Sequence, residues 1–494
     1  MSEIISSTES PTPWPDPGNS GKVASPGPQF SLSGTLILTC IFLSCFGFLI
    51  FVHFETPRLS RFVTPEHHLS RVANQVLYLK SGLAHGQDWE RELNEAVAGQ
   101  GGELNQLIEW YSELEVRSSD PLVNLHLAIL KAENGQHDAV QSDISLWQMK
   151  GQDLVLFSEL IHAAYLTPDE KPDYAHLQAR LAEAVPDSWF YYQLAGRLAE
   201  RSDDEKLGRT IRAVLDQRGS RLVGNSNVIG FLEGGGLVVG GMAFLRLIWL
   251  RQKNGPSIMR VGESAFPPPW PGWHGVTVLL RGGGIAAILL FAISLSGIQP
   301  QTLQVLIPFI LHVPILVWAS RHLLVPYNVT MVRAMGLKVN PNGWMPLLLI
   351  SSCLFLLGFV GNWGLGMVAH NADVTIHWTD WFDPTLVEGG VFSMLGALFG
   401  YVVLAPVLEE FVFRGVLFAT LRRKFSAWPS IIMSAAFFAA LHGYGLLGAT
   451  TIFWSGILWA WAFEKTGSLW PGIIAHALNN LLVCLSVLLL MRPG

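Results

Sequence analysis

The chain has 494 residues, of which 50% are hydrophobic and only 14% are charged. This balance excludes an ordinary soluble protein and indicates an integral membrane protein with a soluble part. The formal net charge of −6 and the lack of a basic block argue against nucleic acid as a partner. The four cysteines all lie in apolar segments and predict neither a disulfide framework nor a cysteine metal site.

Two segments open the chain. Residues 1–33 are rich in Ser, Pro and Gly and cannot bury a core, so they are predicted to form a disordered tail. The apolar stretch 34–53 is long enough to cross the hydrocarbon core of a bilayer. No small-residue cleavage site follows it, and this favours a retained signal-anchor transmembrane helix over a cleaved signal peptide.

Residues 54–222 interleave polar and apolar side chains at helical spacing, and they are predicted to form a soluble α-helical domain. Helix starts at Asp120, Asp153 and Asp187 are 33 and 34 residues apart, and a leucine follows each by seven residues. A period near 34 is typical of tetratricopeptide (TPR) helix pairs, so the domain is predicted to be TPR-like. An irregular helical domain is the alternative, because most Trp, Gly and Pro marks of that repeat are missing.

Residues 225–494 are predicted to form a multi-span membrane domain. Together with 34–53 the chain then has about nine spans, the others lying at about 227–250, 275–296, 302–320, 344–368, 390–418, 429–444, 447–463 and 468–490. The fold class is therefore all-α: a polytopic membrane helix bundle with an inserted soluble helical domain.

Loop charges predict the orientation. Lys and Arg collect at 246–260, 321–338 and 422–424, whereas the loop at 371–388 is acidic and contains Asp373 and Asp380. Because basic loops face the cytoplasm, the N-terminus is predicted to be cytoplasmic, and the helical domain and C-terminus lie outside.

A run of charges interrupts the apolar sequence "APVLEEFVFRG" at 405–415. Ionisable groups at bilayer depth are costly and by default indicate a functional site. Glu410 and Arg414 have i, i+4 spacing, so the guanidinium can reach the carboxylate on one helical face. Glu409 is rotated by about 100° from Glu410 and is free to face a different neighbour.

His442, His476 and Asn480 are polar groups on later predicted spans. At about 1.5 Å per residue from the nearest cytoplasmic end, Glu409 lies about 18 Å deep, His442 about 20 Å and His476 about 13 Å. Groups from three helices are therefore expected to converge near the midplane. A carboxylate with an imidazole can deprotonate water, and an imidazole with a carboxamide can donate to an oxyanion. The predicted chemistry is hydrolysis of an amide inside the membrane.

Three strings carry a family resemblance. "EEFVFR" (409–414), "FAALH" (438–442) and "HALNN" (476–480) resemble the EExxxR, FxxxH and HxxxN motifs of the CPBP family, the CAAX protease and bacteriocin-processing (Abi) intramembrane peptidases. All three occur in the family's order, and the resemblance covers about residues 390–485. It implies a glutamate-type endopeptidase acting on CAAX-box proteins or in bacteriocin maturation, here in a bacterial plasma membrane.

The resemblance also implies residue roles and partners. Glu409 resembles the water-activating carboxylate, which His442 helps by positioning the water, while His476 and Asn480 resemble the oxyanion donors. Glu410 and Arg414 look like a supporting ion pair. No cofactor is expected, although Glu409, His442 and His476 could form a zinc site, so a divalent metal stays an open alternative. The expected partners are membrane lipid, a peptide or lipidated protein substrate, and a protein bound at 54–222.

Other interpretations compete with the peptidase. The chain could be a non-catalytic scaffold or self-immunity protein whose helical domain binds a partner, and a transporter is weaker because no inverted repeat is evident. Two further polar residues receive structural interpretations. Glu233 is predicted to mark a head-group boundary, and His312, beside Pro314, to serve packing or a helix kink.

Overall fold

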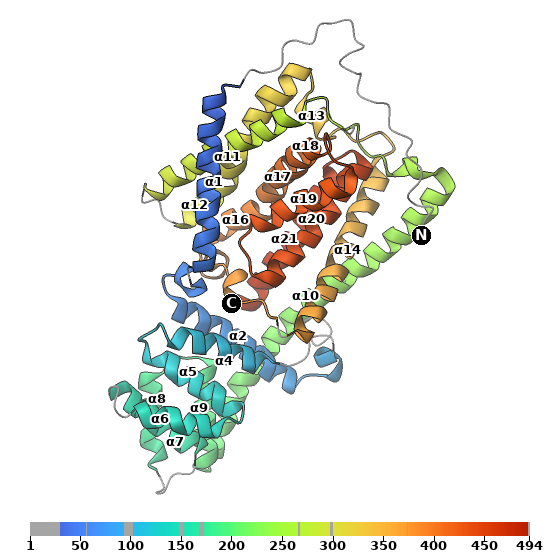
Figure 1. The fold of residues 1–494 in the computed structure, drawn as a ribbon. Coiled ribbons are helices and arrows are strands. Elements are labelled where there is room, and N and C mark those ends of the chain that lie inside the picture. The colour runs from blue at the N-terminus through green and yellow to red at the C-terminus, as the bar shows by residue number, and fades with distance from the viewer. Residues whose placement is uncertain are drawn as a thin grey trace, which may run out of the picture. The chain divides into compact units, whose positions relative to one another are not determined.

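The computed structural model describes residues 30–55, 57–92, 102–147, 152–166, 172–264, 267–296, 300–372 and 374–492. Most of the predicted tail at 1–33, and Asp373, lie outside these residues. Within them every regular element is a helix (Figure 1). The all-α prediction is therefore confirmed for the described part of the chain.

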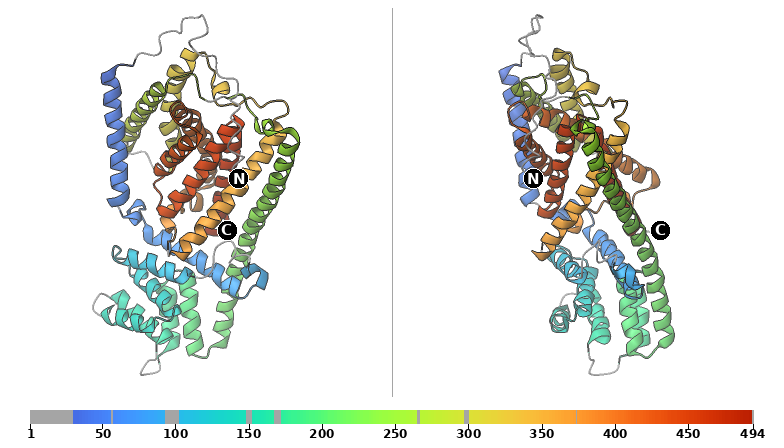
Figure 2. Two further views of the ribbon diagram at one scale, coloured as in Figure 1. Left: turned by 45° about the vertical axis from the view of Figure 1, so that its right-hand side comes forward. Right: turned by 90° about the vertical axis from the view of Figure 1, so that its right-hand side faces the viewer.

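Contacts divide the chain into two units. The first, which we name the membrane unit, comprises Met1–Thr56, Glu233–Ile376 and Glu388–Leu485. The second, the helical unit, comprises Pro57–Leu232, His377–Val387 and Ser486–Gly494. Figure 2 gives two further views of these helices.

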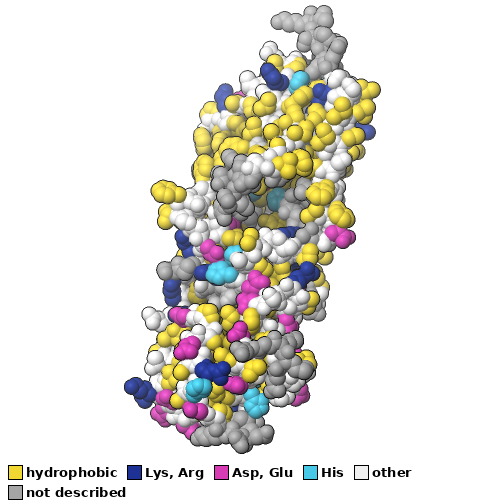
Figure 3. Space-filling model, turned by 90° about the vertical axis from the view of Figure 1, so that its left-hand side faces the viewer, with side chains coloured by type: hydrophobic (Ala, Val, Ile, Leu, Met, Phe, Trp, Pro, Cys, Tyr) yellow, Lys and Arg dark blue, Asp and Glu magenta, His cyan; other side chains and the backbone are white. Residues whose placement is uncertain are grey.

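Eight helices in the described residues are long and apolar enough to cross a membrane, which makes the chain an integral membrane protein. They are α1 (Leu32–Glu55), α10 (Glu205–Asn254), α11 (Gly272–Ser294), α12 (Pro300–Ala319) with η4 (Ser320–Leu324) and η5 (Val325–Tyr327), α14 (Trp344–Asn371), the run 391–421, α20 (Leu446–Thr466) and α21 (Trp470–Met491). The run 391–421 consists of α16 (Val391–Phe399), η7 (Gly400–Leu404), α17 (Ala405–Glu410), η8 (Phe411–Phe418) and α18 (Ala419–Leu421). Hydrophobic side chains cover much of the upper part of the face in Figure 3.

The structure corrects the ninth predicted span, 429–444. Its helix, α19 (Ala427–Ala440), has 14 residues, or about 21 Å, which is shorter than the roughly 30 Å hydrocarbon core. The helix ends at Ala440 with Leu441 as its C-cap, and Gly443 takes a φ of +65°, a left-handed conformation that glycine adopts without strain. His442 therefore lies in the turn between α19 and α20 and not within a span.

A second difference concerns the start of the membrane domain. The sequence ends the soluble domain at 222, but α10 continues through this point without a break. The polar side chains there have partners: Asn225 donates to the Leu489 carbonyl at 2.6 Å, and Asn227 donates to Glu90 Oε1 at 2.9 Å. Because a helix satisfies its own backbone, it can cross such a boundary without ending.

Short loops at one end of the membrane unit bind one another. Val261 and Gly262 donate to the Thr466 carbonyl at 2.9 and 3.0 Å, and the Leu469 N–H donates to the Met335 carbonyl at 3.1 Å. These bonds join η3 (Pro256–Met259) and α13 (Met331–Ala334) to the turn between α20 and α21. They fix the depth at which α20 and α21 enter the bundle, and α21 carries His476.

The helical unit is built from successive helices that pack on their neighbours. Its helices are η2 (Arg58–Arg61), α2 (Pro65–Ala84), α4 (Glu103–Glu115), α5 (Pro121–Glu133), α6 (His137–Trp147), α7 (Gln152–Tyr165), α8 (Tyr174–Ala184), α9 (Trp189–Arg201), the first part of α10, η6 (Trp378–Asp380) and α15 (Pro384–Val387). The three repeated leucines, Leu127, Leu160 and Leu194, are all buried. Asp120 caps α5, whereas Asp153 lies inside α7 and Ser188, not Asp187, caps α9. The TPR type of this array stays a prediction.

The segment between α14 and α16 contributes to the core of the helical unit. Trp378 is fully buried and its ring lies 4.9 Å from that of Phe62, while His377 Nε2 lies 3.4 Å from Glu113 Oε2. Arg492, after α21, donates to the Leu386 carbonyl at 2.7 Å. These segments therefore belong to the same unit as residues 57–204.

Candidate active site

The first motif lies where the helix changes its geometry. Glu409 and Glu410 end α17, and the π-helical segment η8 follows with Arg414. Such π-helical segments are rare and occur frequently at functional sites. Another π-helical segment, η7, precedes α17. Pro406 lacks a backbone N–H, so it cannot donate a hydrogen bond to a carbonyl of the preceding turn. In that preceding segment, the Tyr401 carbonyl accepts a hydrogen bond from Asn480 Nδ2 at 2.9 Å.

Glu410 and Arg414 form an ion pair that is shielded from solvent. Arg414 Nη1 lies 2.9 Å from Glu410 Oε1, and the two side chains are 0% and 1% exposed. The guanidinium also lies 4.4 Å from the ring centre of Phe438, and Nη2 donates to the Gly456 carbonyl at 3.3 Å. A buried pair is tolerated when such additional contacts replace the lost water. The i, i+4 spacing in the sequence is thus realised as an actual contact.

His476 lies between the two glutamates. Its Nε2 is 3.8 Å from Glu409 Oε2, and its Nδ1 is 3.6 Å from Glu410 Oε1. The glutamates differ in their other neighbours, since Arg414 lies 2.9 Å from Glu410. One histidine reaches both carboxylates because its two nitrogens lie at different positions around the imidazole ring. Gly472 permits the approach, since a Cβ there would lie 3.1 Å from Glu410 Oε2.

The ring of His442 is fixed by the helix that precedes it. Nδ1 lies 2.7 Å from the Phe438 carbonyl. Because a carbonyl can only accept, Nδ1 carries the proton, and in the neutral ring Nε2 presents a lone pair. The Phe438 ring lies 4.6 Å from the ring of His442 and 6.1 Å from that of His476. Phe438 therefore connects the second motif to the third.

Asn480 is tied to η7. Besides donating to Tyr401, its Oδ1 lies 3.5 Å from Asn479 Nδ2. The bond to Tyr401 uses one of the two amide hydrogens of Asn480. Asn480 therefore joins α21 to η7 by a hydrogen bond. Such a bond is what we would expect if Asn480 held the helices together and took no part in catalysis.

One contributor to the site, Trp459, could not be read from the motifs. The Trp459 ring of α20 stacks on His476 with centroids 4.0 Å apart and planes 18° apart. It also lies 5.3 Å from the Arg414 guanidinium. The sequence does contain one indication that Trp459 belongs to the site. Trp459 lies in the middle of a span, whereas tryptophans of an aromatic belt lie at span ends.

The same residues bear on metal binding. In the part of the chain that the structure describes, no group of three or more His, Cys, Asp or Glu side chains is arranged to hold a metal ion. Glu409, His442 and His476 therefore do not fit the zinc set that the sequence left open.

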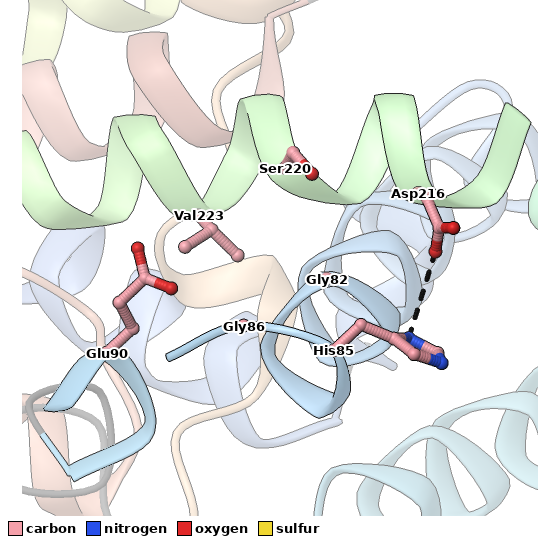
Figure 4. Close-up of a pocket in the computed structure, with 7 residues that line it drawn as sticks. All are labelled: Gly82, His85, Gly86, Glu90, Asp216, Ser220 and Val223. Carbon is pink, nitrogen blue, oxygen red and sulfur yellow. Dashed lines mark ion pairs between the residues drawn. The ribbon is translucent and has the colours of Figure 1, made fainter. Parts of the chain in front are cut away.

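A cavity of about 330 Å³ lies in the helical unit, between α2 and α10 (Figure 4). His85 and Asp216 approach each other across it at 3.8 Å. None of the motif residues lines this cavity, which is bounded by Gly82, His85, Gly86, Glu90, Asp216, Ser220 and Val223.

The region of the three motifs is similar to a known protein family. A family model described as type II CAAX prenyl endopeptidase Rce1-like matches residues 391–482. The match begins with the first residue of α16 and contains all three motif strings. The chain carries a domain of this family. The Rce1-like domain implies a membrane endopeptidase with a peptide substrate. No curated protein and no solved structure matches the chain.

Proposed function

We propose that the chain is an intramembrane endopeptidase in which Glu409 activates a water molecule. The observation that carries this proposal is the place of Glu409 in the Rce1-like domain, 3.8 Å from His476 and next to a glutamate that Arg414 already neutralises. Because Glu410 is paired, Glu409 is the carboxylate left for proton transfer. A carboxylate in such a position is suited to general-base work.

Each side chain then has a defined task. The water donates one hydrogen to Glu409 and the other to His442 Nε2, and its oxygen attacks the scissile carbonyl carbon. An N–H of His476 and the second amide hydrogen of Asn480 donate to the oxyanion that forms. As the C–N bond breaks, Glu409 returns its proton to the leaving amine, so that atoms and charges balance.

The proposed substrate is a CAAX-box-like protein or a peptide in maturation, presented from the membrane. The helical unit, as a TPR-like array, would bind a peptide or partner protein. In the proposed orientation it lies outside a bacterial plasma membrane, and the loops at 246–260, 321–338 and 422–424 face the cytoplasm.

The test is cleavage of a fluorogenic peptide with a prenylated CAAX end by the purified protein in detergent. Glu409→Gln should lose at least about 100-fold in kcat/KM, because the amide cannot take a proton from water. Glu263→Gln is the matched control, since Glu263 is half-exposed in a loop ion pair with Lys338 at 3.6 Å. Each protein is assayed with and without a chelator, which reports any metal requirement.

A scaffold or self-immunity protein is the competing function, favoured by the bundle-holding contacts of Arg414 and Asn480. A scaffold would retain its partner when Glu409 is changed to Gln, because shape and most hydrogen bonds survive. Equal cleavage by wild type and Glu409→Gln would remove Glu409 from the chemistry.

A further inference from the structure

His312, on α12, is a third histidine of the membrane unit whose surroundings belong to the site. The sequence assigned it to packing or a kink. In the structure α12 packs against α17 and η8, the elements that carry the first motif, and also against α16. The His312 ring lies 6.3 Å from that of Phe413, and the Phe413 ring lies 4.9 Å from that of Phe438.

These ring contacts extend to the proposed water-binding residue. The Phe438 ring in turn lies 4.6 Å from the ring of His442. The contacts thus run from α12 through η8 and α19 to the turn that holds His442. His312 is therefore part of the wall of the site.

The hydrogen bonding of His312 fixes which nitrogen can act. Nδ1 lies 2.7 Å from the Pro308 carbonyl, so it carries the proton and leaves a lone pair on Nε2. The side chain is buried, with 8% exposed. A fixed acceptor of this kind is costly to leave unmatched in an apolar environment. His312 shares this arrangement with His442, which is also held through Nδ1 by the carbonyl four residues earlier.

We propose that His312 is a substrate-positioning residue whose Nε2 accepts a hydrogen bond from a backbone N–H of the bound peptide. This inference rests on the proposed peptidase function. A peptide that enters the membrane must satisfy its backbone N–H groups, because an unpaired one costs about 1–3 kcal/mol. An acceptor in the wall supplies one such bond and sets the register of the scissile carbonyl.

The test uses an octapeptide that ends in a farnesylated CAAX box and a set of analogues in which one backbone N–H at a time is replaced by an ester oxygen. His312→Leu should raise KM about tenfold with little change in kcat. His312→Gln, whose amide oxygen reaches the place of Nε2, should restore most of the loss. His274→Leu is the control, because His274 of α11 is also a buried histidine of the membrane unit but bonds Tyr327 of η5.

One ester analogue should lose the same factor with wild type and lose nothing further with His312→Leu. If no position shows this coupling, or if His312→Gln is as impaired as His312→Leu, His312 only packs and the inference is wrong.

A binding measurement distinguishes failure of this inference from failure of the proposed peptidase function. The same farnesylated peptide is titrated onto Glu409→Gln protein with and without His312→Leu. About tenfold weaker binding in the double variant supports positioning even if the wild type cleaves nothing, a result that would overturn the peptidase alone. Unchanged binding, or no binding to either protein, overturns the role of His312.

Discussion

Among single residues, Arg414 is the one on which the geometry of the site depends most heavily. Its guanidinium has 0% exposure and holds Glu410 at 2.9 Å. Replacing it with methionine would keep the volume but leave Glu410 buried beside Glu409 without a cation. We expect Arg414→Met to lower the free energy of unfolding by about 3–5 kcal/mol, the usual cost of breaking a buried pair from one side.

The double variant Glu410→Gln/Arg414→Met should recover most of this loss, because it removes both charges. Unfolding is followed in detergent with increasing denaturant. Arg422→Met is the control, as Arg422 pairs with Glu464 at 3.0 Å near the surface and its side chain is 18% exposed. Equal losses at Arg414 and Arg422 would show that burial does not set the cost.

The sequence predicts part of this residue geometry. The contact between Glu410 and Arg414 follows from i, i+4 spacing within one helix. The approach of His476 to both glutamates does not, because it depends on how closely α21 packs against α17. That distance is permitted by Gly472 and by the stacking of Trp459, and neither shows as a motif in the sequence.

Among the helices, α14 and α20 give the clearest example of close contact. A Cβ on Gly361 would collide with the indole of Trp454, which donates to the Leu357 carbonyl at 3.0 Å. We expect Gly361→Ala to push α20 away and to lower the free energy of unfolding by about 1–3 kcal/mol. Since α20 carries Gly456 and Trp459, which both contact Arg414, activity should fall as well.

Gly364→Ala is the matched control for this prediction, because no atom lies within 4 Å of a Cβ at that position in the same helix. It should be neutral or slightly stabilising, since alanine favours a helix by about 1 kcal/mol over glycine. Stability is measured by thermal unfolding in detergent and activity by peptide cleavage. If the two alanine variants behave alike, contact between α14 and α20 does not determine the site.

Helix existence is the most predictable feature of the elements. Apolar runs of sufficient length marked the positions of all eight long helices. The π-helical segments η7 and η8 and the short α19 could not be predicted, because an apolar run has the same composition whichever helix type it adopts. The end of α19 had a local signal in "HGYG" (442–445), where glycines permit a tight turn.

At the scale of the whole molecule, two buried histidines of the helical unit should make the stability of the folded chain sensitive to acid. Burial lowers the pKa of His126 to about 3, and burial together with the positive charges of Arg58 and Arg61 lowers that of His377 to about 4. Both values lie below the unfolded value near 6.5, so the unfolded chain binds protons first as the pH falls. Stability should therefore be full above about pH 6.5 and should decrease towards pH 4.

This decrease should approach about 1.4 kcal/mol per pH unit for each histidine. Hydrogen exchange of the full chain in detergent measures it, read on peptides from α5 and α9, where the rings of His126 and Phe190 stack at 3.8 Å. His126→Phe should reduce the slope by one histidine's share. A slope that this variant leaves unchanged would mean that His126 can be protonated in the folded state.

Membrane orientation is the prediction that involves the whole chain. Residues 57–204, 377–387 and 486–492 pack within one unit, and the loops around 261, 335 and 466 are joined to one another in the other unit. Each set is therefore expected to share one side of the membrane. The positive-inside rule then predicts that the basic loops face the cytoplasm. In a variant without the four native cysteines, Asp204→Cys should react with a membrane-impermeant maleimide in intact cells. Lys424→Cys should react only after permeabilisation. The reverse pattern would place the helical unit in the cytoplasm, and its binding partners would have to be sought there.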